Sequence, residues 1–371
     1  MKRIIASKYL WIIPSLSLLA LILFFAAQRF FLTSQSIALP PSANQGNARE
    51  NQIEREIPKE ITLETFFDDI EESGKEKTTI VATGDVIPAR SVNRIMRQKK
   101  NFRYPFEATA DVLRSADITL INLESPLIDD CHTTDAGMIF CGDPQFIEGL
   151  QFAGVDVASL ANNHSTNYGK NGVEYTTKLL GDNGIIPIGL GRVEYKTHNG
   201  VRFAFLAYNG ISPLDESIAN IDSKRIQQDI GEAKRNSDVM IVSYHWGKEY
   251  ERYPKTDGEV APFDPVTIAH VTIDAGADIV VGNHPHWYQG IELYRGKVIF
   301  YALGNFIFDQ FWSEETQQGY IAKLIFEKKK LVDIVLLPVY IKNTQPYFVE
   351  GDQKSAFLAK IKEASMMLIQ K

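Results

Sequence analysis

The chain has 371 residues, an apolar content of 44% and a charged content of 23%, which are ordinary values for a globular protein. This length fits one large α/β domain or two average domains. The net charge of −7 lacks the basic excess that nucleic-acid-binding proteins carry, so we expect no nucleic-acid partner. It also argues against tight binding of a polyanion, except locally at a metal site.

Residues 1–32 predict a short cytoplasmic start and a transmembrane anchor. Lys2, Arg3 and Lys8 precede residues 9–28, which carry no charge and are long enough to cross a bilayer as a helix. Positive residues before the span predict a cytoplasmic N-terminus and an extracytoplasmic main domain, in a single-pass protein of the cell membrane. A cleaved signal peptide is the alternative, but the apolar run is long for one and no clean cleavage site follows.

Residues 33–77 have the composition of an extracytoplasmic linker. Proline, serine, asparagine and glutamine come first, and an acidic stretch follows from Glu50 to Glu72. We expect the early part to be disordered. Apolar residues within the acidic stretch predict a short amphipathic helix that docks on the domain. They are Ile61, Leu63, Phe66, Phe67 and Ile70.

Short apolar runs alternate with helical patterns across the main domain, which we place at residues 78–345. The runs at 79–83, 118–121, 155–160, 239–244 and 278–281 predict strands. The stretches 144–152, 173–180, 226–235 and 265–275 predict helices. Further strands are predicted at 299–308 and 320–340, the second as a hairpin around 327–330, and Asn199-Gly200 predicts a hairpin turn. Residues 346–371 predict a C-terminal helix over 355–370. This alternation is typical of an α/β layered domain.

Polar residues follow five of the predicted strands at the point where each strand ends. In such sheets, ligands bind at strand ends, and this mixture of residue types favours a two-metal hydrolytic site. Taken singly, each residue has an ordinary structural explanation as a cap, a turn or a half-buried histidine. Their placement at five successive strand ends favours the metal site. The five clusters are Gly84-Asp85, Asn122-Leu123-Glu124, Asn162-Asn163-His164, His245 and His284-Pro285-His286.

We assign two divalent metal ions to this site, and the mixed donor set favours manganese, iron or zinc. Glu124 would bridge them, since it is the carboxylate on a middle strand end. His164 would act as the general acid or stabilise the attacked oxygen. The remaining predicted ligands are Asp85 and His286 for one metal, and Asn163, His245 and His284 for the other.

The chain has two cysteines, Cys131 and Cys141. Their close spacing and the expected export predict one small disulfide-closed loop. A thiolate metal pair and two free buried thiols are the alternatives.

These motifs resemble the CapA family of poly-γ-glutamate capsule synthesis proteins, within the calcineurin-like metallophosphoesterase superfamily. The resemblance runs from about residue 78 to residue 339. It implies a four-layer α/β/β/α metallophosphoesterase-like sandwich, preceded by an N-terminal transmembrane helix, at the cell surface. The segments that carry it are 83–86, 122–126, 159–164, 245–250, 276–278 with 284–286, and 301–309.

The resemblance also implies roles for residues around the metals. Arg90 stands where the family has a basic residue, which could hold a phosphate or carboxylate of the substrate. Glu249, Tyr250 and Asp309 match family positions and are expected to line the pocket or support the ligands. The chain lacks the histidine of the superfamily's Asp-x-His motif, since Asp85-Val86-Ile87 stands there. The CapA-like branch shares this change, and it shares the use of Glu124 as the bridging carboxylate.

Two functional hypotheses follow. The first is a membrane-anchored metal-dependent hydrolase in poly-γ-glutamate or related envelope-polymer biosynthesis. It would act on a phosphoester or on the amide of an anionic polymer, because a two-metal site can serve either reaction. The second is a non-catalytic accessory subunit beside poly-γ-glutamate synthase or export subunits. A serine hydrolase is disfavoured, because the chain has no Gly-x-Ser-x-Gly elbow.

Overall fold

The computed structural model describes residues 77–132 and 134–369. The predicted anchor, the linker and its amphipathic helix therefore lie outside the described residues. Within these two ranges, no helix combines the length and apolar character needed to span a bilayer.

The first of two sheets has eight strands in the order β14-β13-β12-β1-β2-β3-β4, with β11 paired to the far end of β1. Strands β1 to β4 run parallel, and so does β11, whereas β12, β13 and β14 join antiparallel. Their bounds are β1 Lys77–Val86, β2 Ile118–Leu123, β3 Val157–Ser159, β4 Ile186–Ile188, β11 Asn305–Ile307, β12 Gln318–Glu327, β13 Lys330–Lys342 and β14 Gln345–Phe348.

The second sheet has six strands in the order β5-β6-β7-β8-β10-β9. Strands β6, β7, β8 and β10 are parallel, and antiparallel strands form both edges. Their bounds are β5 Glu194–His198, β6 Val201–Asn209, β7 Val239–His245, β8 Ile279–Asn283, β9 Ile291–Tyr294 and β10 Lys297–Phe300.

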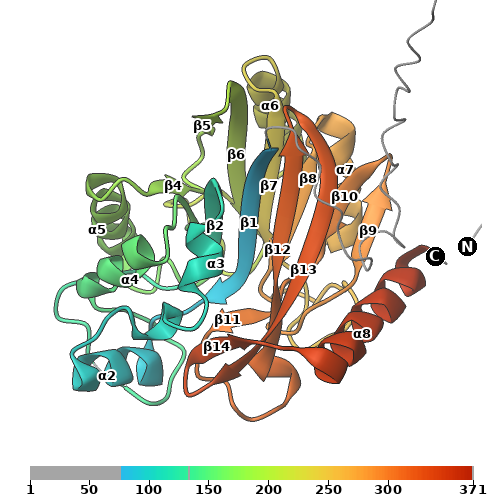
Figure 1. Ribbon diagram of the computed structural model, residues 1–371. Helices are drawn as coiled ribbons and strands as arrows, with labels where there is room; N and C mark the ends of the chain where they lie inside the picture. The colour runs from blue at the N-terminus through green and yellow to red at the C-terminus, as the bar shows by residue number, and fades with distance from the viewer. Residues whose placement is uncertain (1–76, 133, 370–371) are drawn as a thin grey trace, which may run out of the picture. The chain divides into compact units, whose positions relative to one another are not determined.

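The two sheets and their helices form layers (Figure 1), and three apolar clusters hold these layers together. The cluster between the sheets contains Ile80, Phe205 and Phe300. A second cluster packs helices on the outer face of the first sheet, and a third does so on the second sheet. The helices on the first sheet are α2 Arg90–Lys99, α3 Ala110–Arg114, α4 Ile147–Phe152 and α5 Gly169–Asp182; those on the second are α6 Ser223–Lys234 and α7 Pro265–Ala275.

The remaining helical elements complete the fold. Helix α8, Gly351–Ile369, inserts Phe357 and Ile361 into the core between the sheets. Three single 3₁₀ turns lie in the connections at Tyr104–Phe106, Pro144–Phe146 and Glu315–Gln317.

Helix α7 shows how local sequence sets these elements. The Asp264 side chain accepts a hydrogen bond from the Thr267 backbone N–H, and Pro265 occupies the first helical position, where its missing donor costs nothing. The helix ends at Gly276, whose φ of 120° stops it. The predicted helix over 265–275 is therefore confirmed, and so is the predicted hairpin of β12 and β13.

The predicted strand at 299–308 is confirmed at its two ends but is not continuous. The chain leaves the second sheet after Phe300 and joins the first sheet at Asn305, so two short strands, β10 and β11, replace one. Gly304 permits the change of direction, since its φ is +78°, a value that favours glycine. Strand β6 was not predicted, although it lies at the centre of the apolar core with Phe203 and Phe205.

We predict that Gly84→Ala destabilises the fold by about 3 kcal/mol, because the new Cβ would overlap the carbonyl oxygen of Gly304 in a closely packed region. The matched control is Gly181→Ala in α5, where a Cβ meets no atom within 4 Å and should stabilise the helix by about 0.5–1 kcal/mol. Urea unfolding measures both. Equal stability of Gly84→Ala and the wild type would contradict the close approach of β1 to residue 304.

Candidate metal centre

The structure brings the six predicted metal ligands together at the carboxyl ends of strands from both sheets. Asp85 ends β1, and Glu124 and Asn163 follow β2 and β3 of the first sheet. From the second sheet, His245 ends β7, and His284 and His286 follow β8. All of these side chains except Asn163 are buried, with Asp85 and Glu124 fully so.

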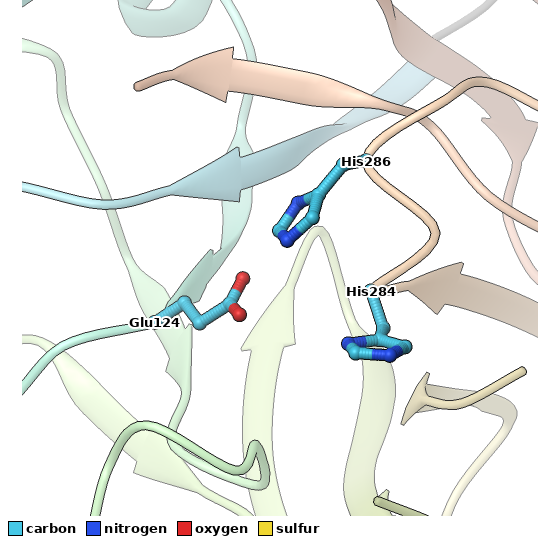
Figure 2. Close-up of side chains that lie close together, drawn as sticks. All are labelled: Glu124, His284 and His286. Atoms are coloured by element: carbon cyan, nitrogen blue, oxygen red, sulfur yellow. The ribbon is translucent and has the colours of Figure 1, made fainter. Parts of the chain in front are cut away.

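Glu124 belongs to both groups of side chains whose geometry could hold a metal ion. One group is Glu124, His284 and His286, drawn in Figure 2, and the other is Asp85, Glu124 and His245. Within each group the donor atoms lie within 4.8 Å of one another. The shared carboxylate agrees with the predicted bridge, but the geometry divides the other ligands differently from the predicted sets.

An amide from the first sheet holds the ligands of both sheets. The Asn122 Nδ2 atom donates to Asp85 Oδ1 at 2.8 Å and lies 3.3 Å from His245 Nδ1. Its Oδ1 atom in turn accepts from Asn162 Nδ2 at 3.1 Å. The Asn162 Oδ1 atom accepts from the His164 backbone N–H at 3.2 Å, which fixes the turn after β3.

Donor atoms from both sheets surround His245 Nε2. His245 Nε2 lies 2.8 Å from Asn163 Oδ1, 3.1 Å from His284 Nδ1 and 3.3 Å from Glu124 Oε1. The Glu124 Oε1 atom is buried and makes no hydrogen bond with the described residues, although an unsatisfied buried carboxylate oxygen is costly. A cation would satisfy it, so the residues fit divalent metal binding.

Burial sets the protonation of His245 and His284. It lowers the pKa of His245 to about 3. Burial, with a smaller effect from the adjacent His245 imidazole, lowers the pKa of His284 well below its ordinary value. Both rings are therefore neutral at pH 7, which leaves a nitrogen lone pair on each to bind a metal.

His286 has the opposite balance. Burial lowers its pKa, but the hydrogen bond to Asp85 and the charges of Glu124 and Asp85 outweigh burial and raise it to about 9. The His286 Nδ1 atom lies 3.1 Å from Asp85 Oδ2 and 2.9 Å from Asn305 Oδ1. Because Asn305 Nδ2 donates to the Thr316 carbonyl, its Oδ1 is the acceptor, and His286 donates from Nδ1.

The two carboxylates also differ. Burial raises the pKa of Asp85, but the hydrogen bond and charge of His286 outweigh burial and lower it. Burial and the nearby charge of Asp85 raise the pKa of Glu124 well above its ordinary value. Glu124 is therefore the acidic group whose charged form gains most from a bound cation.

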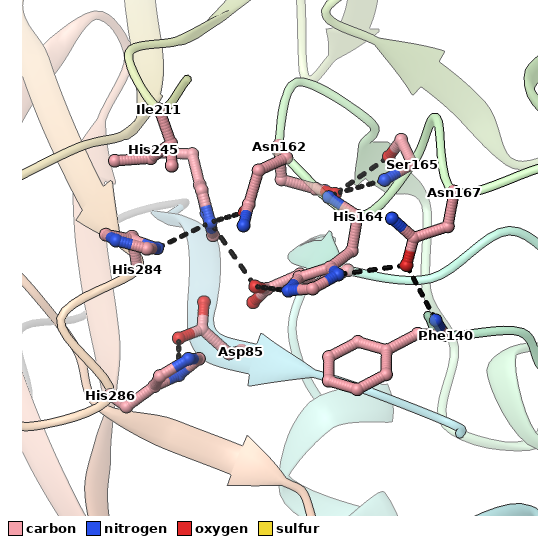
Figure 3. Close-up of polar contacts among 12 residues, drawn as sticks. Asp85, Phe140, Asn162, His164, Ser165, Asn167, Ile211, His245, His284 and His286 are labelled. Atoms are coloured by element: carbon pink, nitrogen blue, oxygen red, sulfur yellow. Dashed lines mark hydrogen bonds and ion pairs between the residues drawn. The ribbon is translucent and has the colours of Figure 1, made fainter. Parts of the chain in front are cut away.

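His164 has a defined tautomer. Asn167 Oδ1 accepts the Phe140 backbone N–H at 2.6 Å and lies 3.0 Å from His164 Nδ1 (Figure 3), so His164 donates from Nδ1. Burial lowers the pKa of His164 to about 4. The neutral ring therefore presents the lone pair of Nε2, 3.9 Å from Glu124 Oε1, and must gain a proton there before it can act as the predicted general acid.

The predicted cysteine pair lies beside this histidine. Cys131 and Cys141 form a disulfide with a Cα–Cα distance of 5.7 Å. Phe140, next to Cys141, stacks on the His164 ring with centroids 4.0 Å apart. The disulfide loop therefore packs against His164, a contact that the sequence did not indicate.

Arg90 has protein partners for its charge. Its guanidinium pairs with Asp309, with Nε 3.0 Å from Oδ1, and it lies over the rings of Phe140 and Phe308, 5.2 Å and 4.8 Å from their centroids. Arg90 thus holds the wall of the site together, and its contact with substrate stays a prediction.

Tyr250 and Glu249 lie on the other side of the site. The Tyr250 ring centroid is 6.1 Å from that of His286, and its hydroxyl accepts from Gln310 Nε2 at 3.1 Å. The Glu249 charge contributes to the raised pKa of Glu124. Both residues are half-buried, and their contact with substrate stays a prediction.

The supporting residues Asn122, Asn167, Asn305 and Phe140 were assigned no role in the site by the sequence. Asn122 stands two residues before Glu124, and Asn305 follows the glycine before β11. Placement at a strand end was the available signal for both. Asn167 and Phe140 lie in loops, and nothing in their spacing indicates their contact with His164.

We predict that the metal-free protein loses stability as pH falls from about 6.5 to 4.5. His164, His245 and His284 are neutral when folded but titrate near pH 6.5 when unfolded, so the unfolded state binds more protons in this range. Each histidine contributes at most about 1.4 kcal/mol per pH unit. The raised pKa of Glu124 offsets part of the effect, because its folded form also holds a proton.

Urea unfolding of chelator-treated protein at several pH values measures this dependence. His284→Asn should flatten the slope, whereas His198→Asn, at a half-exposed histidine outside the site, should not. A stability that does not change between these pH values would contradict the neutral buried histidines.

Comparison with known proteins places the chain in a family. The family model described as bacterial capsule synthesis protein PGA_cap matches residues 79–310, a range that contains all six candidate ligands. Capsule biosynthesis protein CapA of Bacillus anthracis is 28% identical over 313 residues, covering 78% of this chain and 74% of that protein. PGA biosynthesis protein CapA of Bacillus subtilis is 27% identical over 314 residues, covering 80% and 78%.

A solved structure described as a novel phosphatase of Mycoplasma pneumoniae aligns with a TM-score of 0.48 and 14% identity, over 72% of this chain and 94% of that chain. The family match covers more than half of the chain and agrees with the resemblance drawn from the strand-end motifs. The chain therefore belongs to the bacterial capsule synthesis protein family PGA_cap.

Proposed function

We propose that this chain is a metal-dependent hydrolase in the biosynthesis of capsular poly-γ-glutamate or a related anionic envelope polymer. The relatives named for capsule and PGA biosynthesis support the setting. One observation supports the assignment as a hydrolase. The Glu124 carboxylate is shared by two buried ligand groups, and one of its oxygens makes no hydrogen bond with the described residues.

The residues suit two divalent metals, manganese, iron or zinc, with Glu124 between them. Bound there, such metals would lower the pKa of a coordinated water and polarise the attacked oxygen. Asp85 enters the site already ionised, since its pKa is lowered. His245 and His284 supply lone pairs, because burial keeps them neutral.

His164 is proposed to move the proton. Its Nδ1–H is held by Asn167, so Nε2 is the atom that accepts a proton and later returns it to a leaving group. The stacked Phe140 ring excludes water from one face of the imidazole. This order, acceptance before donation, follows from the tautomer.

The substrate is proposed to be either a phosphoester or the γ-glutamyl amide of an anionic polymer. Two cations beside Arg90 and Tyr250 would suit the negative charge of both. We further propose that residues 9–28, which carry no charge, anchor the chain in the membrane. The domain would then lie beside polymer synthase or export subunits.

We predict that the purified full chain, supplied with manganese, iron or zinc, binds about two metal ions, the number expected for a carboxylate-bridged site. His284→Ala/His286→Ala should lose most of this metal. One ion loses both of its histidine donors, and the other ion loses the neighbouring ion with which it shares Glu124. The matched control is His198→Ala/His270→Ala, two histidines outside the site. Elemental analysis after dialysis measures the content, and a wild-type chain without metal in every condition would overturn the proposed hydrolase.

We predict that His164→Ala lowers hydrolysis of the true substrate class by about 10²–10⁴-fold, the usual contribution of proton transfer, while metal content is kept. Turnover of a phosphoester and of γ-glutamyl oligomers, with metal content measured in parallel, tests this, and His270→Ala serves as the control. Polymer output in cells is the second readout. A chain that binds metal but turns over neither substrate, and whose His164→Ala variant keeps full output, would be an accessory subunit.

A further inference from the structure

A second cavity lies at the end of the sheets opposite to the metal centre. Its volume is about 540 Å³. The β12–β13 hairpin lines it from the first sheet, and the end of α6, the start of β8 and the β9–β10 turn line it from the second. These strand ends belong to the edge of the sandwich where β1 begins (Figure 1).

The floor of this cavity is apolar and continuous with the core between the sheets. Ile279, Val298 and Phe326 line it and belong to the inter-sheet cluster. Leu293 and Leu331, also in the lining, are partly buried against the same cluster. The cavity is therefore the open end of the central core.

The rim of this cavity is basic. Four lysines and two aspartates line it, so four positive and two negative charges leave a net charge of +2, in a chain whose net charge is −7. Asp278 accepts from Lys234 at 3.0 Å and from Lys297 at 2.6 Å. Lys329 and Lys330 are exposed and have no ion-pair partner in the part of the chain that the structure describes.

An acidic and apolar segment of the same chain precedes β1. Residues 61–72 contain five acidic residues, Glu64, Asp68, Asp69, Glu71 and Glu72, and no lysine or arginine. The same segment carries Ile61, Leu63, Phe66, Phe67 and Ile70. Its charge is opposite to that of the rim, and its apolar side chains match the floor.

The start of the described chain places this segment within reach. Lys77 is in register with Glu327 on β12, and Glu327 is in register with Lys330 on β13. Neighbouring strands lie about 4.8 Å apart, so β1 begins beside the rim. The five residues from 72 to 77 span up to about 17 Å, which is enough to reach the cavity.

We propose that residues 61–72 occupy this cavity, with aromatic side chains on the apolar floor and carboxylates against the lysine rim. The segment would close the open end of the central core and fix the linker to the domain. The inference does not depend on the proposed hydrolase, because the cavity lies at the other end of the strands.

Hydrogen exchange of the full chain in detergent, read by mass spectrometry on peptides covering 61–72, tests the proposal. These peptides should be protected in the wild type. Lys329→Glu/Lys330→Glu should raise their exchange about tenfold, a change equivalent to about 1.4 kcal/mol. Adding Asp68→Lys/Asp69→Lys to that variant should restore protection, because the charges are exchanged across the same contact.

The matched control is Lys342→Glu/Lys360→Glu, two exposed lysines outside the cavity, which should leave the exchange of 61–72 unchanged. The proposal would be overturned if peptides 61–72 were unprotected in the wild type, or if their exchange were the same in Lys329→Glu/Lys330→Glu as in the wild type. Vesicles with anionic lipid and soluble poly-γ-glutamate provide further arms. Binding of either that needs Lys329 and Lys330, with exchange of 61–72 unaffected, would assign the rim to that partner and reject the segment.

Discussion

This structure depends on one constraint: burying charged side chains, here at one edge of the two sheets, is unfavourable in free energy. Asp85, Glu124 and four histidines are almost completely removed from water, where an isolated ionised group is strongly disfavoured. The chain meets this constraint by dividing the groups. Asp85 and His286 form a charge pair, while His245 and His284 stay neutral. Glu124 is left as the group whose ionisation the protein alone does not support.

This division explains why so many amides surround the site. A neutral amide can donate to a carboxylate and accept from an imidazole without adding charge. Asn122 donates to Asp85 at the end of β1, Asn305 accepts from His286 beyond β8, and Asn167 accepts from His164. The set of charges that a cation would meet is thereby kept small and fixed in position.

The sequence predicted the ligands better than their surroundings. Asp85, Glu124, His245 and His286 each lie at or just past the end of a strand, and the carboxyl ends of parallel strands share one edge of a sheet, so local pattern was sufficient. Phe140 and Asn167 meet His164 through loop conformation, which has no periodicity to detect. The stretch 299–308 is apolar except at Gly304-Asn305, so hydropathy alone does not show its division between two sheets.

That division has a mechanical consequence. The backbone N–H of Leu303 donates to Gly282, two residues before His284, while the carbonyl of the next residue, Gly304, accepts from the N–H of Asp85. The two-residue segment Leu303-Gly304 thus joins the ligand-bearing ends of both sheets. Sliding of one sheet over the other would break these bonds at once, so the spacing between the two halves of the site is held by the main chain itself and is insulated from motion elsewhere in the sandwich.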